Sequence, residues 1–158
     1  MSLNKKQNMK AIAEQLEKLI DRHKTDLLSI PENRMAAKPA PGKWSPKEML
    51  GHLIDSAQSN IRRFIIAQYE DTPHIVYNQD NWVALNDYQH GDTKSIIELW
   101  YQLNKQVCRI LEKIPAEAAE RNCRTEKTHT ISWLASDYLK HLAHHLHVIL
   151  GLEPVAYP

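Results

Sequence analysis

Four histidines lie within seven positions of the chain, at His141, His144, His145 and His147, and two of them have the spacing of a metal-binding pair. On a helix, His141 and His145 are one turn apart, so their imidazoles project from the same face. Apolar residues share that face, so we expect it to turn toward a core. A metal ion would satisfy both ring nitrogens and favour the neutral form that buried imidazoles adopt. Two core histidines hydrogen-bonded to backbone or water, or two partly exposed ones, are an equally good interpretation of this pair alone.

His52 is the candidate for a third ligand, because a metal ion inside a helical bundle needs a ligand from a facing helix. Periodicity does not support this role. On a helical projection His52 lies away from the apolar stripe of its segment and beside Ser56 and Ser59, where a surface residue is expected. Three neutral histidines with an open fourth position would form a catalytic type of site, completed by water or substrate. The histidine pair lacks the glutamate of H-E-x-x-H metalloproteases, so peptidase chemistry of that type is not indicated.

The remaining histidines are weaker candidates. His144 adjoins His141 on the helical projection, as a substitute ligand or as a group behind the ligands, whereas His147 points away and is expected in solvent. Four others lie at helix ends or in connections and are predicted to be surface residues, although the connection that carries two of them could fold over the metal: His23, His74, His90 and His129.

Two carboxylates and two neutral polar residues could support such a site. Asp55 and Asp137 each lie one helical turn from a candidate ligand, so either could accept the second N–H of an imidazole and fix its tautomer. Solvated surface carboxylates are the alternative. Tyr101 and Asn104 lie near the inner side of a predicted helix, where they could contact a substrate or simply occupy flank positions. No catalytic residue is identified by the sequence.

Four amphipathic helices are predicted to position these residues. Apolar residues at steps of three and four predict the first helix, which Pro31 ends. The second helix has the clearest start, because Ser45-Pro46-Lys47-Glu48 combines an N-cap, a proline at N1 and a capping-box glutamate. The chain has only four glycines, which suits helices better than a turn-rich sheet, and Gly151 suits the left-handed cap of the last helix. The expected ranges are about 12–28, 45–69, 93–113, and from Thr130 or Ser132 to Gly151, with Asp92 or Thr93 as the cap of the third helix.

A long crossover separates the second helix from the third. Residues 70–91 mix turn formers with aromatic residues, so we expect a connection with one helical turn rather than a strand, and its aromatic residues could line a site. The four tryptophans are predicted to belong to the core. The sequence therefore predicts an all-α four-helix bundle with a long crossover between helices 2 and 3. No repeat or low-complexity tract divides the chain, so residues 1–158 are predicted to form a single domain.

Composition excludes several classes of protein. Twenty basic and nineteen acidic side chains give a net charge of +1 and no basic stripe, so nucleic acid is not an expected partner. The only cysteines, Cys108 and Cys123, form no C-x-x-C motif, which argues against a disulfide framework or a thiolate zinc site. Neither a signal peptide nor a membrane span is indicated, so we expect a cytoplasmic protein without a membrane partner.

Two strings of the chain resemble the motifs of a known family. KWSPKEMLGHLIDS resembles the second-helix motif of the DinB-like superfamily, including its YfiT branch, and YLKHLAHHLHVIL resembles the fourth-helix motif with H-x-x-H-H. The resemblance implies a four-helix bundle, often a homodimer, that holds zinc, nickel or a similar divalent transition metal with three histidines. Carried over by position, these ligands are His52, His141 and His145, and for His52 the resemblance outweighs the helical projection.

The resemblance implies three hypotheses for function. The leading one is a metal-dependent transferase, in which the ion activates a low-molecular-weight thiol co-substrate such as bacillithiol for transfer to a small-molecule electrophile. The second is a metal-dependent hydrolase with metal-activated water as the nucleophile. The third is a non-enzymatic metal-binding bundle for storage, sensing or stability. Imidazole suits several metals, so the sequence does not identify the ion.

Overall fold

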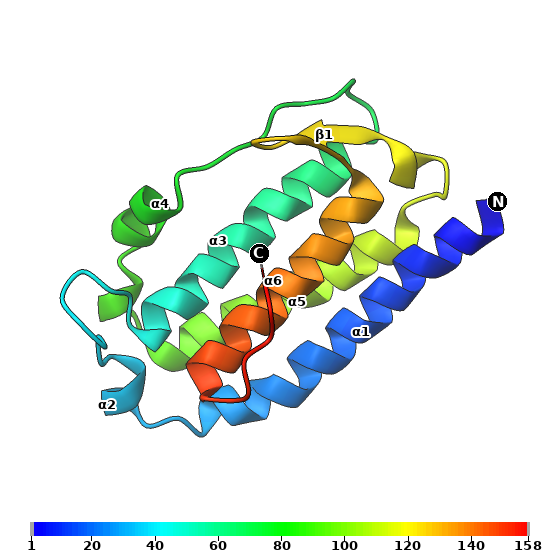
Figure 1. Ribbon diagram of the computed structural model, residues 1–158. Coiled ribbons are helices and arrows are strands. Elements are labelled where there is room, and N and C mark those ends of the chain that lie inside the picture. The colour runs from blue at the N-terminus through cyan, green and yellow to red at the C-terminus, as the bar shows by residue number, and fades with distance from the viewer. Residues whose placement is uncertain (1, 158) are drawn as a thin grey trace.

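Four long helices form the body of the protein in a computed structural model that describes residues 2–157, with side chains from Asn8 onward (Figure 1). The long helices are α1 (Ser2–Leu28), α3 (Pro46–Ile66), α5 (Thr93–Lys113) and α6 (Ile131–Leu150). The short elements are α2 (Glu32–Met35), α4 (Gln79–Asn86), η1 (Tyr88–His90), η2 (Ala118–Glu120), β1 (Asn122–Arg124) and β2 (Thr128–Thr130). The predicted all-α four-helix bundle with a crossover between its second and third long helices is confirmed.

The helix ends follow the capping chemistry of the sequence. Ser45 and Glu48 form the predicted capping box at the start of α3, in which each side chain accepts a hydrogen bond from the other residue's backbone N–H. Asp92 caps α5 and Thr130 caps α6. At the end of α6, Gly151 adopts the left-handed conformation with φ 66°, as predicted.

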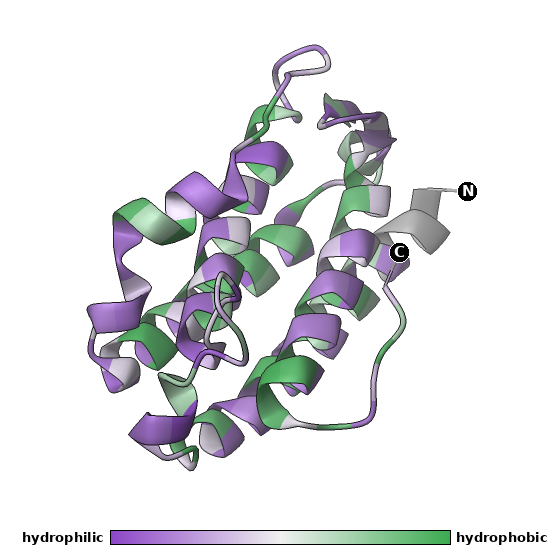
Figure 2. Cartoon of the chain, turned by 60° about the vertical axis from the view of Figure 1, so that its left-hand side comes forward, coloured by the Kyte–Doolittle hydropathy of each residue, from purple (hydrophilic) through white to green (hydrophobic). Residues whose placement is uncertain are grey.

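The helices pack in a bundle in which α1 and α3 each contact both α5 and α6. Their apolar faces turn inward and their polar faces outward (Figure 2). The largest fully buried side chains come from all of the four long helices except α6, together with α2: Trp100, Phe64, Met9, Leu16, Ile20, Leu27, Met35, Leu50, Leu53, Ile54, Ile97 and Leu111. Among the described residues, no helix is long and apolar enough to span a membrane.

The connections contain more regular structure than predicted. The crossover holds α4 and η1 instead of a single turn, and the segment before α6 forms an antiparallel hairpin in which Cys123 pairs with His129. The sequence analysis missed this hairpin, because two strands of three residues are too short to show an alternating pattern. His74 of the crossover pairs with Arg124 of β1, so the hairpin ties the crossover to the start of α6.

The crossover covers a face of α3 that periodicity assigns to solvent. Residues 50–57 of α3 are all buried, because α4 and η1 pack on the side of the helix opposite to its partners in the bundle. Gly51 lies directly beneath Tyr88 of η1, and a Cβ atom at position 51 would lie 2.0 Å from the Tyr88 ring. Tyr88 in turn donates a hydrogen bond to Asp55. The absence of a side chain at position 51 therefore allows the crossover to close over α3.

Replacing Gly51 with alanine should destabilise the protein, although alanine favours a helix more than glycine does. The new methyl group must displace the Tyr88 ring and its hydrogen bond to Asp55, so we expect a loss of about 1–3 kcal/mol in the free energy of unfolding. Urea denaturation followed by circular dichroism measures this change. Arg62→Ala, at an exposed position of the same helix, is the control and should change stability by less than about 0.5 kcal/mol. Equal stability of Gly51→Ala and the wild type would contradict the close packing of η1 on α3.

Candidate metal site

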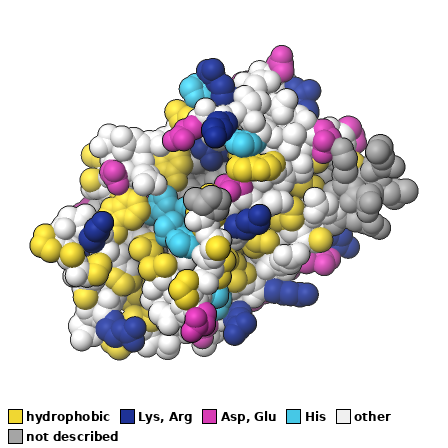
Figure 3. All heavy atoms as spheres, viewed as in Figure 1, with side chains coloured by type: hydrophobic (Ala, Val, Ile, Leu, Met, Phe, Trp, Pro, Cys, Tyr) yellow, Lys and Arg dark blue, Asp and Glu magenta, His cyan; other side chains and the backbone are white. Residues whose placement is uncertain are grey.

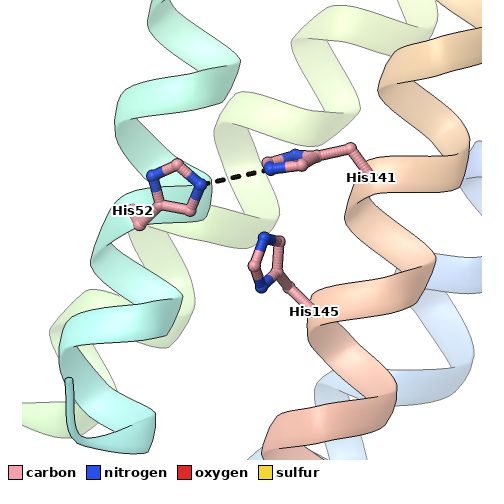
Figure 4. A group of neighbouring side chains, drawn as sticks. All are labelled: His52, His141 and His145. Carbon is pink, nitrogen blue, oxygen red and sulfur yellow. Dashed lines mark hydrogen bonds between the residues drawn. The ribbon is translucent and has the colours of Figure 1, made fainter. Parts of the chain in front are cut away.

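Three histidines from two helices converge on a common point. His52 projects from α3, and His141 and His145 project from α6 toward it (Figure 4). One ring nitrogen from each side chain lies within 4.8 Å of the other two, and the Nε2 atoms of His52 and His141 are 3.2 Å apart. This is the only group of three potential metal ligands found among the described residues. The structure thus brings together the three residues that the sequence analysis selected.

His52 lies in the interior, so the prediction from the helical projection is wrong. Its side chain is only 2% exposed, since α6 covers one side of this part of α3 and the crossover covers another. The ring of Trp44 packs against it with the ring centroids 5.1 Å apart. The projection assumed that α3 has one buried face, whereas this end of the helix is enclosed on several sides.

Burial keeps the three imidazoles neutral. Desolvation lowers the pKa of His52 to about 4, with a smaller effect from His145. Desolvation lowers the pKa of His141 to about 3, with smaller effects from the neighbouring His145, His52 and His144. Burial also lowers the pKa of His145 to about 4, with a further effect from His144. At neutral pH each ring therefore presents an unprotonated nitrogen, which is the form that binds a metal ion.

The facing nitrogens of these rings are placed as ligands of one ion would be. His52 and His141 turn their Nε2 atoms toward each other, whereas the Nδ1 atom of His52, which has no hydrogen-bond partner among the described residues, lies on the other side of its ring (Figure 4). The nitrogen separations can be compared with those around a tetrahedral ion, where bonds of about 2.0–2.1 Å place two ligand nitrogens about 3.3 Å apart. The His52–His141 distance matches this value, and small rotations of the imidazoles would bring the third nitrogen into range. The donor set therefore fits one divalent transition metal.

A small polar chamber adjoins the histidines. It has a volume of about 130 Å³, and its walls are His52, Ser56, Asn60, Arg63, Tyr77, Gln79, Asp137, Tyr138, His141 and Tyr157. A larger cleft of about 970 Å³ shares five of these residues with it: Arg63, Tyr77, Gln79, Asp137 and Tyr157. Figure 3 shows histidine atoms at the surface of the face seen in Figure 1, beside hydrophobic side chains. Because the chamber shares wall residues with the larger cleft, it connects the three histidines to that cleft.

Tyr157 forms part of this site, and the sequence analysis missed its role. Tyr157 lines the chamber and donates a hydrogen bond to Asp137 across 3.0 Å. Burial raises the pKa of Tyr157 to about 12, so the phenol is protonated at neutral pH. Tyr77 and Gln79 of the crossover also line the chamber, which confirms that the crossover folds over the histidines. The aromatic character of the crossover was the only sequence signal for these residues, and nothing marked Tyr157.

Of the other predicted site residues, Asp137 and His144 lie at the chamber, whereas Asp55 does not. Asp137 lines the chamber, and His144 lies beside it, where its Nδ1 donates to the carbonyl oxygen of Val155. Neither Asp55 nor Asp137 is hydrogen-bonded to a candidate ligand. Asp55 is instead buried under the crossover, where it accepts hydrogen bonds from Tyr88 and Asn86.

The two candidates on α5 lie away from the chamber walls. Tyr101 donates to Asp21 at the surface between α1 and α5. Asn104 is fully buried and accepts a hydrogen bond from Tyr138, which itself lines the chamber. Asn104 therefore supports the chamber wall from behind, and Tyr101 belongs to a helix–helix contact.

The structure corrects the predictions for His147, His23 and Trp133. His147 is half-buried, and its Nδ1 donates to the carbonyl oxygen of Glu153 instead of facing solvent. His23 is only 2% exposed and pairs with Asp26. His74 and His90 are exposed as predicted. His129 is half-buried and stacks on Trp133, which is 46% exposed and so does not belong to the core as predicted.

YfiT of Bacillus subtilis, described as a probable metal-dependent hydrolase, is similar to this chain. The two sequences are 26% identical over 116 residues, which cover 71% of this chain and 65% of YfiT, so the match spans just under two thirds of that relative. The solved structure of YfiT has an unusual four-helix bundle topology and matches the present one with a TM-score of 0.81 at 20% identity. That match covers 92% of this chain and 89% of YfiT. The two proteins share the fold.

The family is identified over most of the chain. The profile of the DinB superfamily matches residues 8–149, which include α3, α6 and all three converging histidines. The resemblance found in the two sequence motifs is thereby confirmed. The chain belongs to the DinB superfamily.

Proposed function

We propose that this protein is a metal-dependent enzyme for a small molecule, with one divalent ion held by His52, His141 and His145. The convergence of three neutral imidazoles, one buried and two half-buried, beside an open polar chamber is the observation that carries the proposal. A bound ion of this kind lowers the pKa of a coordinated water or thiol and so supplies a nucleophile at neutral pH. A storage or structural role would favour a closed site instead.

The protein's own residues would bind and orient the substrate beside the ion. Ser56, Asn60 and Gln79 offer hydroxyl and amide groups to a polar substrate in the chamber. Arg63 is held in the chamber wall by hydrogen bonds from its guanidinium to the carbonyl oxygen of Ile75, so its charge is fixed in place. The larger cleft provides room for the rest of the substrate, since ligand pockets commonly measure about 300–1,000 Å³.

Hydrolysis is the reaction that we propose first. YfiT, described as a probable metal-dependent hydrolase, supports this choice, and a polar chamber next to the ion would admit water. Asp137 is the carboxylate in the chamber wall, and its side chain could accept the proton that water loses. The sequence analysis found no such base, because the position of Asp137 relative to the histidines depends on the packing of α6 against α3.

Thiol transfer is the second candidate. The motif resemblance supports it, and the size of the larger cleft allows a thiol and an electrophile to bind together. In this reaction the ion would hold the thiol, so the choice between the reactions is a choice of nucleophile. Bacillithiol-type thiols fit the chemistry, with the thiol end in the chamber and the remainder in the cleft.

Metal binding should depend on all three histidines. Metal-stripped protein should take up one equivalent of Zn²⁺, Ni²⁺ or Co²⁺, and His52→Ala or His145→Ala should weaken binding by at least about a hundredfold, since even residues behind the ligands contribute 10–100-fold. Chelator competition and isothermal titration calorimetry measure this effect. His90→Ala removes an exposed histidine outside the cluster and is the control, with an unchanged affinity. An affinity that survives His52→Ala would refute the proposed ligand set.

The nucleophile can be identified by a panel of small esters, amides and electrophiles tested with and without added thiol. The hydrolase proposal predicts product from esters or amides in the absence of any thiol, with activity lost after metal removal. Asp137→Asn should lower kcat by about a hundredfold while metal affinity stays unchanged. Conjugation that requires added thiol would favour the transferase. Full activity in a metal-free sample would contradict both reactions.

The metal-free protein should lose stability as the pH falls below 6.5. The three histidines have pKa values of about 3–4 in the folded state, so unfolding takes up protons between pH 6.5 and 4. Each histidine then lowers the free energy of unfolding by at most about 1.4 kcal/mol per pH unit, because the two states differ by at most one proton on each ring. Asp55 has the opposite effect on stability. Burial raises its pKa to about 6, so the folded state binds one proton as the pH falls and gains stability from it. Urea melts of wild-type protein and of His141→Gln across this range isolate the effect, because the variant should show a shallower slope. Parallel profiles would show that burial does not hold His141 neutral.

A further inference from the structure

The chain does not leave the bundle after α6 but turns back along that helix (Figure 1). We call residues 152–157 the C-terminal segment. Its first backbone N–H, from Leu152, donates to the carbonyl oxygen of His147 across 2.9 Å. The Nδ1 atom of His147 lies 2.6 Å from the Glu153 carbonyl oxygen, and that of His144 lies 2.7 Å from the Val155 carbonyl oxygen. A carbonyl oxygen can only accept, so both ring nitrogens donate, and the two histidines of α6 outside the cluster hold this segment.

These anchors place Tyr157 against one of the candidate metal ligands. Its ring centroid lies 5.3 Å from that of His141 and 5.9 Å from that of His144. Its hydroxyl group donates to Asp137 across 3.0 Å. The side chain is half-buried and is therefore fixed by contacts at both its ring and its hydroxyl group. A tyrosine held in this way is a rigid part of the wall.

The two cavities meet at Tyr157. The residue lines the small chamber that contains His52 and His141, and it also lines the larger cleft. Tyr157 and its partner Asp137 therefore belong to the boundary between the cleft and the histidines, with Arg63, Tyr77 and Gln79. The chamber behind them measures only about 130 Å³, which suits a small end group and not a whole substrate.

We propose that Tyr157 determines which groups can reach the open coordination position, admitting unbranched end groups and excluding those branched at the carbon next to the metal-binding group. This inference rests on the proposed function, because it requires an ion at the three histidines. The substrate class that follows has a slender polar end on a larger body. The body would lie in the cleft, where the stacked rings of His129 and Trp133, 3.6 Å apart, provide a flat aromatic wall.

Two carboxylates that differ only in branching test this inference directly. Acetate and pivalate bind metal through the same group with similar basicity, and pivalate carries three methyl groups next to it. In protein loaded with Co²⁺, a ligand that enters the coordination sphere changes the visible absorption spectrum, so both affinities can be measured without any knowledge of the substrate. We expect wild-type protein to bind acetate at least about tenfold more tightly than pivalate.

Three variants separate the ring, the hydroxyl group and the segment. Tyr157→Ala, and deletion of residues 152–158, should bring the ratio of the two affinities close to one by admitting pivalate, with little change for acetate. Tyr157→Phe keeps the ring and loses only the hydrogen bond to Asp137, so it should retain most of the wild-type selectivity. Tyr69→Ala removes a tyrosine that is 67% exposed and lines neither cavity, and it should behave as the wild type.

The outcomes distinguish the inference from the proposed function. A Co²⁺ spectrum with the same affinity ratio in wild type and Tyr157→Ala would overturn the role of Tyr157 and leave the metal site intact. The absence of any Co²⁺ spectrum in wild-type protein would overturn the proposed function, and this inference with it. A ratio that falls in Tyr157→Ala and in the deletion, but not in Tyr69→Ala, would establish Tyr157 as a residue that determines specificity.

Discussion

The convergence of three neutral, largely desolvated imidazoles between α3 and α6 is the constraint on which the rest of the structure depends. Each ring has given up water, and its pKa is lowered for that reason to about 3–4. The Nε2 atoms of His52 and His141 face each other 3.2 Å apart, and one nitrogen of His145 lies within 4.8 Å of both side chains' ligand atoms. Neutral ring nitrogens that converge in a desolvated site are the form that binds a metal ion. An ion between the rings would bind these facing nitrogens at separations close to those observed, and this is why the cluster is interpreted as a metal site.

The crossover and the C-terminal segment both form walls around these histidines. The crossover encloses His52 because Gly51 lets Tyr88 approach α3, and the same crossover supplies Tyr77 and Gln79 to the chamber. At the other end, His144 and His147 hold the C-terminal segment against α6. The dense histidine motif of α6 therefore has two uses: one pair of rings faces the site, and the other pair fixes its outer wall.

Local sequence chemistry predicted the fold well and the site only in part. The capping residues Ser45, Asp92, Thr130 and Gly151 marked the helix ends, because caps are decided by residues next to one another in sequence. The spacing of His141 and His145 likewise needed only the geometry of one helix. His52 could not be found in this way, since its burial comes from elements far away in sequence, and only the family motif identified it. Tyr157 had no signal at all, because its place depends on how the end of the chain folds back.

The central claim is that side chains from α3 and α6 hold one ion with an open position toward the chamber. A crystal structure of metal-loaded protein, with the element identified by anomalous scattering, tests this most directly. The account predicts a single ion about 2.0–2.1 Å from one nitrogen of each of His52, His141 and His145, with a water or other small ligand on the chamber side. An ion bound elsewhere, or a fourth protein ligand that closes the site, would contradict it.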